Sequence, residues 1–177
     1  KRQFDRAVVE SGLSHRVIRS SMLFGPRDVL LSVMLRSMDR YPVFPMFGDG
    51  QYHVNPLAVA DLARVLRLEA ASSEEGTIDV GGPAVYRYRD LTDLMFNALG
   101  KRARYWRLSA RGSIALAWGL QHLGSRLLYA YEVEWLLSDR LGVPPYTGLD
   151  RPLTRVEPFI SAEAGRIRAG GRPPPDA

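Results

Sequence analysis

The residues of this sequence that could do chemistry gather at the end of one short apolar stretch. The segment from Val17 to Pro26 is rich in apolar and β-branched residues and stops at a Gly-Pro pair, as a buried strand does. Helical patterns precede and follow it, which is the order of a parallel α/β sheet. Ligands of such sheets bind beyond the carboxyl ends of the strands. Ser20, Ser21 and Met22 are therefore the first candidates for a ligand site, and an ordinary strand end is the alternative.

Other catalytic and metal chemistries find no support in the sequence. Cysteine is absent, which excludes disulfides and thiolate metal sites. The histidines His15, His53 and His122 lack the spacing of metal ligands. No Gly-x-Ser-x-Gly pattern occurs, which sets serine hydrolysis aside. The Gly-Asp-Gly of residues 48–50 lacks the strand and helix that flank a phosphate loop, so it predicts a hairpin turn.

The elements that position the candidate residues follow from the hydrophobic pattern. Apolar residues at helical spacing predict helices over the first ten residues, after a capping Asp28, and from Asp61. Thr77 to Val80 predicts a strand, and a helix follows it and ends at Gly100. The order of these elements predicts an α/β fold with a parallel sheet.

The composition is that of an ordinary soluble domain, with 46% apolar and 24% charged residues among 177. That length is enough for one domain with a core. The net charge is +5, but the basic residues are scattered and not interleaved with aromatic ones, so we expect no nucleic-acid partner. The chain opens in an amphipathic helix without an initiator Met or a signal-peptide pattern, which predicts a fragment of a longer protein.

An ordered set of motifs carries a resemblance to a known family. Lys1 with Asp5 is followed by Ser-Gly-Leu at 11–13 and by Ile-Arg-x-x-x-x-Phe-Gly-Pro at 18–26. Further along come FGDG, PLAVADLAR, DVGGP and a helix ending in ALG. Over residues 1–108 this order resembles the C-terminal part of extended or atypical short-chain dehydrogenase/reductases, the NAD-dependent epimerase/dehydratase superfamily. The most similar group includes NmrA-like proteins and the NAD(P)H-binding accessory subunit of respiratory complex I.

The resemblance implies a site and a cofactor. Lys1 falls at the lysine of the family's Tyr-x-x-x-Lys pair, whose tyrosine would lie four positions upstream of this chain. In that role its ammonium would bind the nicotinamide ribose and lower the pKa of the tyrosine, so Lys1 is the expected catalytic and cofactor residue. A surface lysine is the alternative. Ser20, which stands where the family usually has Pro, would contact NAD or NADP together with Ser21 and Met22.

A departure from the family pattern bears on the substrate. Sugar-nucleotide epimerases carry an arginine shortly after the Gly-Asp-Gly turn, where it holds the substrate diphosphate. The matching residue here is Val54, which cannot neutralise a diphosphate. The resemblance therefore implies a small-molecule substrate that is not a nucleotide sugar, and an apolar or quinone-like ligand, or no ligand, fits better.

Beyond residue 108 the resemblance fades and the pattern predicts a helical extension over 109–165. The charge-free run at 112–125 is shorter than the roughly 18–20 residues that span a bilayer. Core helices are one interpretation of residues 113–137. The other is a membrane-surface or partner-facing segment, because Trp118 and Trp135 suit an interface. The Gly- and Pro-rich residues 166–177 predict a disordered tail.

Two functions stay open from the sequence. The first is an NAD(P)-dependent oxidoreductase or epimerase, represented here by the C-terminal half of its Rossmann-like domain with a substrate-side lobe over residues 1–108. The second is a non-catalytic accessory or membrane-peripheral subunit that docks through its aromatic C-terminal helices. We expect a cytoplasmic protein in the first case and one at a membrane surface in the second.

Overall fold

The stretch that predicted one strand forms two in the structure, a computed structural model that describes residues 2–26, 28, 30–122, 133, 136–138 and 141–170. Strand β1 (Arg16–Ser20) pairs in parallel with β6 (Gly76–Val80), and β2 (Leu23–Phe24) pairs in parallel with β5 (Leu57–Ala58). The chain changes partner between them: the Ser21 N–H donates to Val80 O (3.0 Å), whereas Met22 O accepts from the Leu57 N–H (2.7 Å). The parallel α/β fold is confirmed, and the single continuous strand is wrong.

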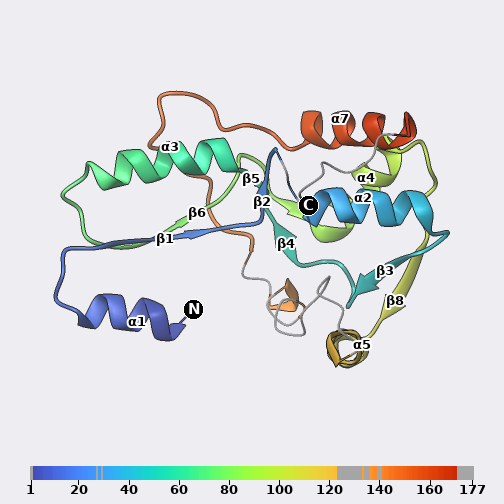
Figure 1. The fold of residues 1–177 in the computed structure, drawn as a ribbon, viewed down its shortest axis with the longest axis horizontal. Helices are drawn as coiled ribbons and strands as arrows, with labels where there is room; N and C mark the ends of the chain where they lie inside the picture. The colour runs from blue at the N-terminus through green and yellow to red at the C-terminus, as the bar shows by residue number, and fades with distance from the viewer. Residues whose placement is uncertain are drawn as a thin grey trace.

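Helices alternate with these strands along the chain (Figure 1). They are α1 (Arg2–Glu10), α2 (Leu30–Arg40), α3 (Val59–Ala70), α4 (Tyr88–Ala98), α5 (Ala110–His122) and α7 (Glu157–Arg168). Asp28 caps α2 as predicted, because its carboxylate accepts the Ser32 N–H at 3.0 Å. Gly100 ends α4 as predicted, with φ of 70°. None of the described helices is long and apolar enough to cross a membrane.

The Gly-Asp-Gly turn does not close a hairpin. The strand before it, β3 (Phe44–Phe47), pairs in parallel with β8 (Tyr105–Leu108). The strand after it, β4 (His53–Val54), pairs antiparallel with β7 (Tyr86–Arg87). The turn instead meets the start of α4, where the Arg89 N–H donates to Gly50 O (3.0 Å) and the Tyr88 N–H to Tyr52 O (2.9 Å). Gly48 and Gly50 adopt φ of 64° and 72°, which favour glycine.

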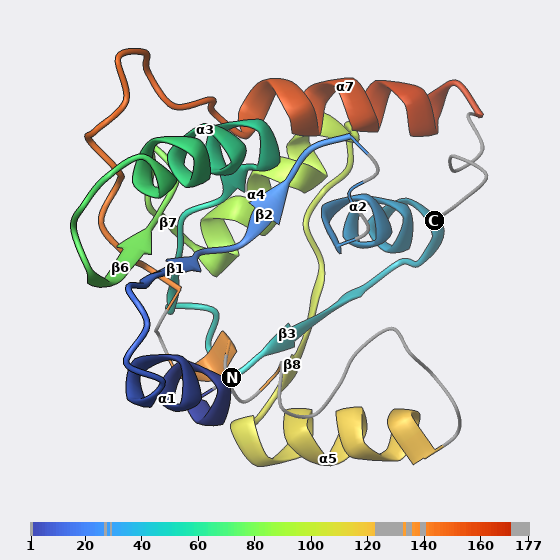
Figure 2. The same ribbon diagram turned by 60° about the vertical axis from the view of Figure 1, so that its left-hand side comes forward.

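One core joins the predicted substrate-side lobe to the predicted helical extension. Helix α7 packs against α2 and α4, as Figure 2 shows, and buries Ile160 and Ala164 completely. The Phe24 and Phe159 rings lie 5.4 Å apart between centroids. The helix continues through Arg168, so the tail predicted from residue 166 begins inside a helix. Residues 171–177, and most of residues 123–140 in the predicted helical extension, lie outside the described residues.

The start of α7 is attached to β7 through a carboxylate. The Tyr86 hydroxyl donates to Glu157 Oε1 at 2.7 Å, and Arg155 Nη2 donates to the same oxygen at 2.5 Å. These bonds, that of Arg155 above all, lower the pKa of Glu157 from 4.5 to about 2. Because protonation removes the charge that attracts Arg155 and weakens both bonds, the attachment of α7 depends on pH.

We predict that Glu157→Gln removes an acid-sensitive part of the stability. A carboxyl group whose pKa is lower in the folded chain stabilises it above the unfolded pKa, and this contribution disappears as the pH falls through the folded pKa. Wild type should therefore lose stability relative to Glu157→Gln as the pH falls from about 4.5 to about 2. Urea unfolding at a series of pH values measures the difference. Exposed Glu10→Gln is the control, and an equal pH dependence for both variants would contradict the prediction.

Candidate functional site

Residues 141–156, here called the return segment, pass along the ends of several strands without forming a helix or a strand of their own (Figure 1). Leu141 forms a parallel bridge with Val54 of β4, and Pro145 forms one with Gly81, directly after β6. The Gly81 N–H donates to Pro144 O at 3.1 Å. The carboxyl edge of the β1–β6 pair, where the sequence predicted a ligand site, is therefore in contact with the return segment.

The three predicted cofactor residues lie at this edge, in different surroundings. Ser20 ends β1 opposite Val80 and is half-buried. Ser21 is 5% exposed, and its hydroxyl donates to Leu141 O at 2.7 Å. Met22 is 8% exposed and belongs to the main hydrophobic core. The structure thus gives Ser21 and Met22 structural contacts and leaves the Ser20 side chain as the accessible one of the three.

Asn55 is the centre of a closed hydrogen-bond network at the same edge. This side chain is fully buried; its Nδ2 donates to Val143 O at 2.5 Å and its Oδ1 accepts the Val143 N–H at 3.3 Å. The Gly82 N–H donates to Asn55 O at 3.1 Å. An amide supplies both a donor and an acceptor, so it can pair with both backbone groups of Val143, which no carboxylate or apolar side chain can do.

The Gly-Gly of the DVGGP motif allows this close approach. A Cβ at Gly81 would lie 1.9 Å from Asn55 Nδ2, and one at Gly82 would lie 1.7 Å from Pro56 O. Both distances are too short for any side chain. These glycines are required for packing of the return segment and not for the left-handed backbone that glycine often supplies.

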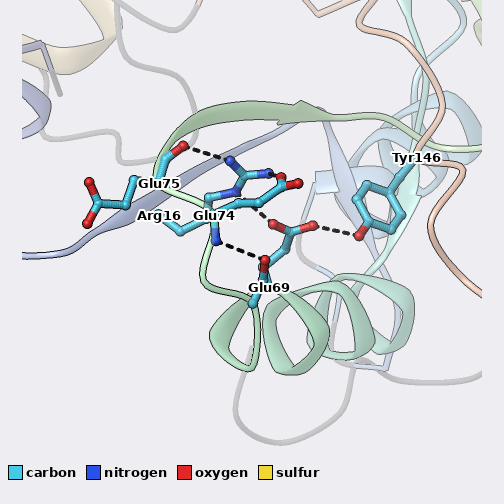
Figure 3. A network of polar contacts seen from close by, with 6 residues as sticks. Arg16, Glu69, Glu74, Glu75 and Tyr146 are labelled. Carbon is cyan, nitrogen blue, oxygen red and sulfur yellow. Dashed lines mark hydrogen bonds and ion pairs between the residues drawn. The ribbon is translucent and has the colours of Figure 1, made fainter.

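A second network holds the return segment against β1 and α3 (Figure 3). Arg16 Nε donates to Glu69 Oε2 at 2.7 Å, and the Tyr146 hydroxyl donates to Glu69 Oε1 at 2.6 Å. Arg16 also bonds Glu74 Oε2 at 3.0 Å and Glu75 O at 2.9 Å. The Tyr146 and Arg16 bonds lower the pKa of Glu69, while burial and Glu69 raise the pKa of Tyr146 to about 12.

Asp61 completes the set of buried polar contacts to this segment. The sequence placed Asp61 in the first turn of a helix; in the structure it is fully buried and accepts the Thr154 N–H at 2.6 Å and Arg64 Nη1 at 3.0 Å. The sequence analysis missed the roles of Asn55, Glu69 and Tyr146. The only available signal was polarity: Asn55 and Glu69 interrupt apolar positions, and a polar residue that is buried must find a partner.

The described residues do not by themselves fit a nicotinamide dinucleotide. At the predicted edge the Ser21 hydroxyl and the Asn55 amide have protein partners, and no Gly-rich turn joins a parallel strand to a helix N-terminus in the described chain. Lys1, the predicted catalytic residue, lies outside the described residues. No group of acidic or histidine side chains in the described part could hold a metal ion.

Comparison with known proteins identifies the fold. A nucleoside-diphosphate-sugar epimerase from Staphylococcus aureus superposes with a TM-score of 0.61 at 15% identity, over 88% of this chain and 55% of that one. UDP-glucuronic acid 4-epimerase from Bacillus cereus gives 0.58 at 17% identity, over 95% and 50%. The dTDP-glucose 4,6-dehydratase from Streptomyces venezuelae, solved with NAD, gives 0.55 at 19%, over 96% and 49%. The fold is that of the NAD-dependent epimerase/dehydratase-type short-chain dehydrogenase/reductases.

Comparison of the sequence with curated proteins finds a subunit of a mitochondrial NADH dehydrogenase. Subunit 9 of the NADH dehydrogenase [ubiquinone] 1 alpha subcomplex, mitochondrial, from Arabidopsis thaliana is 25% identical over 109 residues, which are 59% of this chain and 27% of that protein. No model of a protein family matches. The chain spans about half the length of the solved structures. The resemblance to the superfamily is thereby confirmed at the level of fold, and the resemblance to the complex I subunit is confirmed as a sequence similarity over part of that protein.

We predict that Asn55→Asp destabilises the chain more at neutral pH than at acid pH. An ionised carboxylate would face the Val143 carbonyl, now 2.5 Å from Asn55 Nδ2, whereas a protonated one can donate to it. Burial beside carbonyl oxygens raises the pKa of the new carboxyl, so the variant recovers stability relative to wild type as the pH falls through that pKa. The loss at pH 7 should be about 3 kcal/mol.

Asn97→Asp, at an exposed position of α4, is the matched control and should cost at most about 0.5 kcal/mol. Urea unfolding at neutral pH and near pH 4 measures both variants. A loss for Asn55→Asp no larger than that of the control, or one that grows on acidification, would show that the network does not hold the return segment.

Proposed function

We propose that this chain is the substrate-side, C-terminal part of an NAD(P)-binding oxidoreductase or epimerase of the short-chain dehydrogenase/reductase type. In this proposal a preceding half of the same protein supplies the phosphate-binding loop and docks against β1. When bound, the nicotinamide would supply hydride chemistry. This chain would supply Ser20 at the carboxyl end of β1 and the predicted Lys1. Its substrate-side lobe would form a wall of the substrate site.

The observation that carries the proposal is that β1 has a strand partner on only one of its two edges in the described chain. Within the described residues β1 pairs with β6 alone, so its other edge has no strand partner. Helix α1 lies beside it at one end of the molecule, apart from the other described helices (Figures 1 and 2). Val9 of this helix is 53% exposed, and Leu13 after it is 72% exposed. An unpaired strand edge, together with the exposed apolar side chains of Val9 and Leu13, suits a further strand and helix of the same sheet.

The substrate proposed for this site is a small carbonyl compound without a diphosphate. Val54, at the position where the resemblance implies an arginine in sugar-nucleotide epimerases, is fully buried and pairs with Tyr86 and Leu141. No guanidinium can reach the site from this position. A substrate without a diphosphate, such as an apolar or quinone-like carbonyl compound, needs no such group.

A non-catalytic accessory role is the second candidate, and α5 favours it. This helix buries its small residues, Ser113 and Ala117, and exposes Ile114 by 36% and Trp118 by 60%. Large apolar side chains on the outer face suit docking to a protein or a membrane surface. The similarity to a complex I subunit supports the same role.

The residues before Lys1 in the reading frame of the parent gene separate the two candidates. A Tyr four residues before Lys1 would favour the enzyme. Its absence, with the glycine-rich nucleotide loop retained, would favour the accessory subunit. The corresponding locations are the cytoplasm and a membrane surface.

We predict that this chain alone does not bind NADH tightly, whereas the parent protein with its preceding half does. The phosphate groups would find no loop of backbone N–H donors in the chain alone. NADH fluorescence, which rises when the nicotinamide leaves water, measures both in parallel titrations. Tight binding by the isolated chain would place the phosphate site in these residues and refute the proposal. Absence of binding by a folded parent would leave the accessory role.

A further inference from the structure

A basic pocket lies away from the predicted cofactor edge, where α2 leads into β3 and α4 into β8. It has a volume of about 440 Å³ and lies beside Met38, Tyr41 and Phe96, with arginines at its rim. In both ribbon views the connection from α2 to β3 is at the side of the molecule opposite to α1 and β1 (Figures 1 and 2). A ligand bound in this pocket would not contact Ser20 at the carboxyl end of β1.

The charges around this pocket do not cancel. Lys101 and Asp39 pair with each other, with Nζ 2.6 Å from Oδ1, and Lys101 also donates to the Asp39 backbone carbonyl. Arg40, Arg102 and Arg104 remain as three positive charges on the lining. All three are exposed, and within the described residues none of the three guanidinium groups has a hydrogen bond or an ion pair. By contrast, Arg16, Arg36 and Arg64 each pair with a carboxylate elsewhere.

The backbone holds two of the arginines on the outer side. Ala103 and Tyr105 pack against the main core, and Arg102 and Arg104, which alternate with them, are exposed. The Phe44 N–H donates to Arg104 O at 2.9 Å, which fixes this segment beside the start of β3. The guanidinium groups are therefore carried by an ordered backbone and lie at one opening.

Two helices end here, and their carbonyl ends disfavour anions. Lys101 donates to the Asp39 carbonyl at the end of α2, and its charge is paired with the Asp39 carboxylate, so the three arginines carry the excess positive charge at this opening. Guanidinium groups bind phosphate oxygens in a bidentate manner, and the exposed Tyr41 ring offers a flat apolar wall next to them.

We propose that this pocket binds the phosphate groups of a small phosphate-bearing ligand through Arg40, Arg102 and Arg104, with Tyr41 against its apolar part. The site is separate from the predicted dinucleotide edge and does not depend on the proposed function. A soluble phosphoester and the headgroup of an anionic lipid share this chemistry, and the experiment separates them.

Calorimetric titration of the full chain with inorganic pyrophosphate tests the site. Wild type should bind, more weakly at higher salt, and Arg102→Gln/Arg104→Gln should lower the affinity by about tenfold or more. The matched control is Arg107→Gln/Arg111→Gln, which removes the same charge from exposed positions outside the pocket and should change the affinity by no more than about twofold. Thermal unfolding checks that both double variants remain folded.

Sedimentation with phosphatidylcholine vesicles, with and without phosphatidic acid, is the second arm. Pyrophosphate binding without vesicle binding supports a soluble ligand. Binding of both, lost together in Arg102→Gln/Arg104→Gln, supports a lipid headgroup. Failure of wild type to bind pyrophosphate, or equal losses in the two double variants, would overturn the proposal.

Discussion

The structure depends on holding an irregular segment against the ends of its strands without leaving backbone polar groups unpaired. The return segment has no ladder of its own, and buried side chains of the α/β part supply its partners. Ser21 bonds Leu141, Asn55 bonds Val143, Glu69 bonds Tyr146 and Asp61 bonds Thr154, each over more than seventy residues of sequence. A buried polar group left without a hydrogen-bond partner costs about 1–3 kcal/mol. The four side chains avoid this cost by bonding the return segment, so we assign them to holding that segment in place.

That constraint changes how the predicted site is understood. In the sequence a serine at the carboxyl end of a parallel strand suggests a ligand contact, but the Ser21 hydroxyl already has a backbone partner. Because the carboxyl edge is covered, attention moves to the lateral edge of β1 that has no strand partner in the described chain, and to Val9 and Leu13, which are exposed just before β1 in the sequence. A dinucleotide site would then form between this lateral edge and a further part of the sheet, with the return segment as its support.

Local signals predicted the elements whose limits are set locally. The strand at Thr77–Val80 and the end of α4 at Gly100 follow from β-branched residues and from a glycine in the left-handed region. The break after Ser20 was missed because it depends on a change of partner from β6 to the distant β5. The hairpin at 48–50 was wrong because β8 and β7 pair with its two strands. Asn55 was missed because its partner lies 88 residues away and leaves no periodic trace.

The functional account rests on the claim that one edge of β1 is unpaired in this chain and pairs with the preceding half of the parent protein. Hydrogen exchange of the β1 amides tests this claim most directly. Successive residues of a parallel strand direct their N–H groups to opposite edges. We expect the amides directed to β6 to be protected and the alternate ones to exchange rapidly in this chain alone. The alternate amides should become protected when the preceding half of the parent protein is present. Protection of every β1 amide in the isolated chain, or no change in the parent, would contradict the account.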